Sequence, residues 1–172
     1  MIVLHDLCEF EQFEDITQQI RSRKKSSLCI SSPGGNVTAT IFFCNIIRKY
    51  IENGRLENVF VLDECSSSAF IIFLTFPKHK RYMSEVSLCT IHQSTTEFSD
   101  KSGKNKLIKH GENMDLLNKR CYDVCHLTNN EKNMLIKLEE KERILTPYDI
   151  VSLGLLDKKN IVPVKTNLEF LV

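Results

Sequence analysis

The stretch Ser32-Pro-Gly-Gly-Asn-Val-Thr-Ala39 decides how this chain is expected to fold. It lies between a predicted strand, residues 27–31, and a predicted helix, residues 37–51, which Gly54 is expected to end. Two adjacent glycines let a strand-to-helix turn adopt backbone conformations closed to other residues and approach a ligand closely. Amides near a helix start can also bind negative charge. Taken alone, the stretch is more typical of an ordinary Pro-Gly turn than of a ligand site.

Strands and helices alternate along the rest of the chain. Further strands are predicted at residues 2–4, 58–62, 86–92 and 161–164, and helices at 10–20, 67–76 and 114–125. Two more helices are expected to begin at the capping sequences Thr128–Glu131 and Thr146–Asp149, and the polar residues 94–106 are expected to form a loop. This alternation favours a parallel sheet covered by helices, in one α/β domain over residues 1–172.

The composition is that of an ordinary globular protein. A chain of 172 residues with 42% hydrophobic and 26% charged residues can bury a proper core, which argues against disorder. The net charge of +1 gives no general electrostatic reason to expect nucleic acid or an anionic membrane as partner. The longest apolar run, Ala69–Leu74, is too short to span a bilayer, and the N-terminus lacks the basic region of a signal peptide. We therefore expect a cytoplasmic protein.

Seven cysteines, an odd number, occur without any Cys-x-x-Cys pair. Most lie inside apolar stretches, so we expect reduced, buried thiols. Cys121 and Cys125 are four residues apart on a predicted helix with His126 beside them. A zinc site needs further ligands, and none is evident, so core packing is expected and no metal site.

Two other segments carry side chains suited to covalent catalysis. Cys65-Ser-Ser-Ser68 lies between a strand and an apolar helix, and His92 ends a strand. Serine is a poor nucleophile until a base removes its proton, and histidine is the side chain best suited to do so near neutral pH. Alone, the serine is also typical of a helix N-cap, and the histidine of an ordinary strand end.

In this order, the segments resemble the proteolytic subunit of the Clp proteases, serine peptidases of the ClpP/crotonase fold. Ser32–Ala39 is similar to the family's Ser-Pro-Gly-Gly-x-Val/Ile-Thr-Ala-Gly, with Thr40 in place of the last glycine. Lys80–Tyr82 and Ile91–Gln93 look like its Lys-Arg-Tyr and Ile-His-Gln. Leu145–Asp157 resembles its Leu/Met-Ser-Ala-x-Glu-Ala-x-x-Tyr-Gly-Leu-Ile/Val-Asp. The likeness implies an α/β, ClpP/crotonase-like fold of stacked β-β-α units with a C-terminal helical part.

The resemblance also implies a nucleophile and a base. Ser67 falls on the nucleophile and His92 on the general base, because their separation (92 − 67 = 25) matches the family without a gap. Ser66 is the alternative nucleophile, since it fits the following Ala69-Phe70 better but needs a compensating gap. The amides of Gly35 and Ser68 fall on the donors of the oxyanion hole.

The resemblance places the acid of the triad just before residue 145. Glu142, in Lys141-Glu-Arg-Ile144, matches the family's aspartate, and its role would be to orient the base. The alternative acids are Glu139, Glu140 and Asp149.

The expected function is therefore a serine endopeptidase that cuts peptides or unfolded proteins through an acyl-enzyme. The family resemblance implies a homo-oligomeric ring and no cofactor, while an unfoldase ATPase as partner has no support in the sequence. Leu62-Asp-Glu-Cys65 is bulkier and more charged than the family's approach to the serine. This motivates an alternative, a catalytically silent ring subunit or scaffold. A third hypothesis is a crotonase-type acyl-CoA enzyme, which uses backbone oxyanion donors without a serine–histidine pair.

Overall fold

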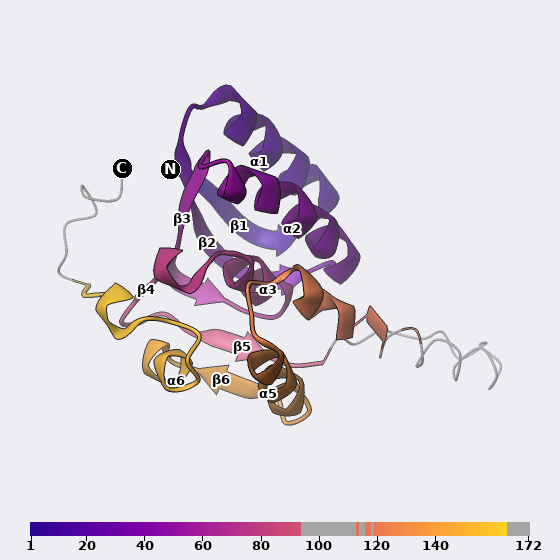
Figure 1. Cartoon of the computed structure of the whole chain (residues 1–172), viewed down its shortest axis with the longest axis vertical. Coiled ribbons are helices and arrows are strands. Elements are labelled where there is room, and N and C mark those ends of the chain that lie inside the picture. The colour runs from indigo at the N-terminus through magenta and orange to yellow at the C-terminus, as the bar shows by residue number, and fades with distance from the viewer. Residues whose placement is uncertain (94–112, 114–115, 118, 165–172) are drawn as a thin grey trace.

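The computed structural model describes residues 1–93, 113, 116–117 and 119–164 (Figure 1). Within these residues, a parallel five-stranded sheet has the order β1-β2-β3-β4-β7, and an antiparallel pair joins β5 to β6. The strands are β1 (Ile2–Cys8), β2 (Ser26–Gly35), β3 (Leu56–Cys65), β4 (Arg81–Ser84), β5 (Cys89–Ile91), β6 (Arg143–Leu145) and β7 (Ile161–Val162). The predicted parallel α/β architecture is therefore confirmed.

The helices are α1 (Phe10–Ser22), α2 (Val37–Glu52), α3 (Ser68–Thr75), α5 (Asn129–Glu139) and α6 (Pro147–Ser152). Helices α1 and α2 pack side by side beside β1, and α3 lies between α2 and β2 (Figure 1). The Phe13 ring of α1 stacks on the Phe43 ring of α2, with centroids 4.2 Å apart. Every residue of α3 is buried, as its apolar sequence predicts. This burial fixes the start of α3, where the serine cluster lies.

A buried arginine fastens the C-terminal part of the chain to the end of α3. Arg81, at the start of β4, is only 1% exposed, and burial lowers its pKa to about 10. Its guanidinium donates hydrogen bonds to four carbonyl groups, those of Leu74, Phe76, His126 and Leu155. Carbonyl dipoles from three separate segments therefore replace the water that the cation loses.

The observed elements differ from the predicted ones in several places. The strands predicted at residues 86–92 and 161–164 are shorter than expected, and β4 and β6 were not predicted. The predicted helix over 114–125 gives way to a 3-10 turn at Tyr122–Val124, and the described residues before it are helical. The predicted loop at residues 94–106 lies outside the described residues.

The cysteines are organised as predicted. No disulfide links any of the seven, and six of them are buried. Within the described part of the chain, no cluster of three or more His, Cys, Asp or Glu side chains could hold a metal ion. Across the same residues, no helix has the length and apolar character needed to cross a membrane.

Candidate active site

Ser67 occupies a strained turn between β3 and α3. Its φ of 52° and ψ of −126° lie in a region that a non-glycine residue rarely adopts. Such strain persists only where the surrounding structure imposes it, and it concentrates at functional sites. A serine on a sharp strand-to-helix turn is also the arrangement of the nucleophile elbow in hydrolases. Ser67 is half-buried, whereas Ser66 and Ser68 on either side are buried.

The glycine turn of β2 touches this elbow directly. A Cβ built on Gly34 would lie 2.7 Å from the Cβ of Ser67 and 3.1 Å from the amide nitrogen of Ser68. Ser32 holds the turn in place, because its hydroxyl accepts a hydrogen bond from the Gly34 amide at 3.1 Å and donates to the Asp6 carbonyl. The first two predicted segments are therefore in contact.

The strand that leads to His92 runs beside the same elbow. The Ser67 amide donates to the Thr90 carbonyl at 2.7 Å, and the Thr90 amide donates to Ser66 Oγ at 3.0 Å. His92 follows Thr90 by two residues, so the segment that carries His92 contacts Ser66 and Ser67. Among the described residues, no hydrogen bond joins Ser67 Oγ to the His92 ring, whose Nδ1 lies 2.8 Å from the Gln93 carbonyl. Catalytic hydrogen bonds in unliganded enzymes often tighten only when substrate binds.

Three segments that are distant in the sequence thus converge at one end of the parallel sheet. A comparison with protein families finds that the Clp protease model matches residues 13–162. The chain belongs to the Clp protease family. Members of this family form oligomeric rings and act on peptide substrates. No curated protein matches the chain.

In this Clp protease family chain, the two candidate serines have different environments. Ser66 is 4% exposed, and its hydroxyl already accepts the Thr90 amide. Ser67 is more accessible, and its hydroxyl makes no hydrogen bond within the described residues. The geometry therefore favours Ser67 over Ser66 as the reactive hydroxyl.

The two oxyanion-hole candidates lie at the end of β2 and at the start of α3. Ser68 begins α3, so its amide is one of the unpaired donors at a helix start. Gly35 is paired with Cys8 of β1, and the Asn36 amide donates to the Cys8 carbonyl at 2.9 Å. The sequence analysis proposed Gly35 as an oxyanion donor, whereas Gly34 is the glycine whose lack of a side chain leaves room for the Cβ of Ser67.

Glu142, the predicted acid, lies in the turn before β6. The register of the antiparallel β5–β6 pair ends with Ile91 opposite Arg143, and His92 and Glu142 are the next residues beyond this last pair. Its backbone has a positive φ of 41°, and its side chain is exposed. No hydrogen bond to its carboxylate occurs within the described part of the chain.

Glu139, one of the alternative acids, is hydrogen-bonded to a buried tyrosine. It ends α5, is half-buried and accepts a 2.5 Å hydrogen bond from the Tyr122 hydroxyl. Burial raises the pKa of Glu139 to about 7, against the lowering effects of the Tyr122 hydrogen bond and of His92. The sequence analysis gave Glu139 only as an alternative acid, because the family motif aligns with Glu142, three residues later.

The other two alternative acids have different surroundings. Asp149 accepts hydrogen bonds from the Thr146 amide and hydroxyl at the start of α6, which lower its pKa. It therefore serves as part of a capping box. Glu140 is exposed at the end of α5.

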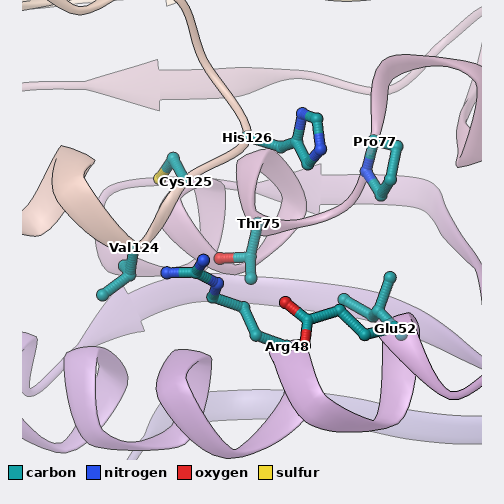
Figure 2. Close-up of a pocket in the computed structure, with 8 residues that line it drawn as sticks. Arg48, Glu52, Thr75, Pro77, Val124, Cys125 and His126 are labelled. Carbon is teal, nitrogen blue, oxygen red and sulfur yellow. The ribbon is translucent and has the colours of Figure 1, made fainter.

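A cavity of about 200 Å³ lies at the opposite end of α3 from Ser67. Figure 2 shows Arg48 and Glu52 rising from α2 toward Thr75, with His126 on the far side. None of Ser67, His92, Glu139 or Glu142 lines this cavity. It is therefore separate from the candidate active site.

Proposed function

We propose that this Clp protease family chain is a serine endopeptidase with Ser67 as nucleophile and His92 as general base. The observation that carries the proposal is the strained Ser67 turn, which touches Gly34 and is hydrogen-bonded to the strand leading to His92. Glu142 is proposed as the acid of the triad; its support is that it directly precedes Arg143, whose partner in the β5–β6 ladder, Ile91, directly precedes His92.

In the first half of the reaction, Ser67 Oγ attacks the carbonyl carbon of the scissile peptide while His92 takes its proton. The amides of Gly35 and Ser68 stabilise the oxyanion, each donor contributing roughly 3–4 kcal/mol. His92 then protonates the leaving amine, the C–N bond breaks, and an ester with Ser67 remains.

In the second half, His92 removes a proton from water, whose oxygen attacks the ester carbon. The C–O bond to Ser67 breaks, the serine regains its proton from His92, and the free carboxyl product leaves. The groups that perform these steps are side chains and backbone amides, so the proposed chemistry requires no cofactor. By family membership, we also propose a homo-oligomeric ring and a cytoplasmic location.

A fluorophosphonate probe tests the proposal, because it reacts with activated serine hydroxyls. We expect covalent labelling of the intact, folded protein that disappears in Ser67→Ala. Ser152→Ala is the matched control, since Ser152 is an exposed serine on α6 whose hydroxyl donates only to the Tyr148 carbonyl. Absence of labelling in a folded ring would favour the silent scaffold instead.

A second measurement separates the acyl-CoA hypothesis. Turnover of an acyl-CoA thioester that survives in both Ser67→Ala and His92→Gln would favour crotonase-type chemistry. Loss of peptide cleavage in the same two variants would favour the peptidase.

A further inference from the structure

The cavity of about 200 Å³ at the far end of α3 lies where two helices end. Thr75 is the last residue of α3, and Ile51 and Glu52 are the last two residues of α2. The volume is smaller than the roughly 300–1,000 Å³ of sites that hold drug-sized molecules, so the cavity suits a smaller ligand. The remaining lining residues are Arg48, Pro77, Val124, Cys125 and His126.

Hydrogen bonds hold the wall opposite α2 in place. The buried Thr75 hydroxyl donates to the Ile71 carbonyl at 2.9 Å, and the Cys125 thiol donates to the same carbonyl at 3.5 Å. The His126 amide donates to the Leu74 carbonyl at 2.8 Å. This wall is therefore preformed, and a ligand that binds against it does not have to order it first.

Two opposite charges on α2 face the cavity without pairing with each other. Figure 2 shows the Arg48 and Glu52 side chains rising from α2 toward Thr75. Residues four apart on a helix are neighbours, but a base that precedes the acid is the less favourable order for an ion pair. In the part of the chain that the structure describes, neither side chain has an ion pair or a hydrogen bond. Both charges are therefore available to a ligand.

The position of Glu52 points to an ammonium group. Glu52 is the last residue of α2, and the C-terminal end of a helix carries a partial negative charge. A carboxylate at this end is unfavourable for the helix, whereas a cation bound beside it is attracted by both the carboxylate and the helix end. A residue that breaks such a local rule without a compensating contact is expected at a functional site.

We propose that this cavity binds a free α-amino acid with an aliphatic side chain. The planar fork of the Arg48 guanidinium matches the ligand carboxylate, and Glu52 accepts hydrogen bonds from the ligand ammonium. Ile51, Pro77 and Val124 provide the apolar surface for the ligand side chain. The inference does not depend on the proposed peptidase, because no proposed catalytic residue lines the cavity.

The spacing of the two charges favours a single amino acid over a peptide. Side chains four residues apart on a helix have Cβ atoms about 5–6 Å apart. The ammonium and carboxylate of an α-amino acid are attached to the same carbon, so both can reach this pair at once. Each added residue moves the two termini of an extended peptide about 3.3–3.6 Å further apart.

Isothermal titration calorimetry of the folded chain with L-leucine tests the proposal. We expect saturable binding to one site per chain, weakened at least about tenfold in Arg48→Gln and in Glu52→Gln, because each variant loses a charge-assisted hydrogen bond. Both variants are expected to fold, since neither side chain has a partner to lose. Lys49→Gln and Glu11→Gln remove exposed charges outside the cavity and should bind L-leucine like wild type. No saturable binding, or equal affinity in all four variants, overturns the proposal.

Three analogues test the two charges and the length of the ligand. Leucinamide lacks the carboxylate and N-acetyl-leucine lacks the ammonium, so each should bind at least about tenfold more weakly than L-leucine. Binding of N-acetyl-leucine as tight as that of L-leucine contradicts the role of Glu52. Tighter binding of the dipeptide leucyl-leucine contradicts a site for a free amino acid.

A peptidase can also hold a reaction product in its active site, so Ser67→Ala and His92→Gln are titrated with L-leucine as well. Binding that is unchanged in both variants supports the cavity, whether or not Ser67 reacts with the fluorophosphonate probe. Binding that is lost in both variants but kept in Arg48→Gln places the ligand at the active site and overturns the inference.

Discussion

The Cβ of Ser67 occupies the space that a side chain on Gly34 would need, because the two Cβ atoms would lie only 2.7 Å apart. A Cβ on Gly34 would also lie 2.9 Å from the Ser66 carbonyl oxygen. Real Cβ atoms do not approach backbone this closely, so the glycine turn and the serine elbow require each other. The Ser-Pro-Gly-Gly stretch thus contributes to the candidate site through an absent side chain as well as through its amides.

Gly34→Ala is therefore expected to disable the site. The φ of Gly34 is +107°, where an alanine is strained by about 1–3 kcal/mol, and the new methyl group pushes the elbow away from β2. We expect a lower midpoint of urea unfolding and loss of probe labelling at Ser67 in the protein that remains folded. Both are measured on the same preparation.

Gly54→Ala provides the matched control for that variant. Gly54 also has a positive φ of +74°, but a Cβ there meets nothing within 4 Å. We expect a cost of about 1 kcal/mol from backbone strain, with labelling unchanged. Equal labelling losses in the two variants would mean that strain alone, and not the approach to Ser67, is responsible.

Ser66→Ala is expected to weaken labelling without abolishing it. Ser66 Oγ accepts the Thr90 amide, so the alanine leaves this amide without its partner and loosens the strand before His92. The loss of that bond costs about 1–3 kcal/mol of stability. Rate measurements on folded Ser66→Ala and Ser67→Ala check this ordering. Complete loss of labelling in Ser66→Ala, with labelling retained in Ser67→Ala, would make Ser66 the nucleophile.

Arg81→Lys is expected to destabilise the chain even though the charge is kept. A lysine ammonium cannot reproduce the planar fork that serves four carbonyl groups, so at least one stays buried without a donor. We expect a loss of about 2–4 kcal/mol in the free energy of unfolding. Arg48→Lys, at an exposed position of α2, should change the free energy of unfolding by less than about 0.5 kcal/mol.

The sequence was sufficient to predict the α/β fold and to predict that the glycine turn, the serines and the strand before His92 come together. Periodicity and capping signals act locally, which is why α1, α2, α3 and the caps at Thr128 and Thr146 were found. Short β4 and β6 were not found, because their pairing depends on neighbours distant in the sequence. The same dependence left Glu139 as one of three alternative acids, because its contact with Tyr122 forms only when two segments 17 residues apart pack together.

Glu139 also predicts a pH dependence of stability. Its pKa is raised to about 7 in the folded chain from an ordinary value of 4.5, so between these pH values the folded state holds a proton that the unfolded state has released. Folding therefore takes up a proton, and stability falls as the pH rises from 4.5 to 7.

Glutamine does not titrate, so the free energy of unfolding of Glu139→Gln minus that of wild type should increase across this window and level off above pH 7. Urea unfolding at a series of pH values measures this difference. A difference that stays flat, or that decreases with pH, would show that Glu139 is not held in a desolvated site.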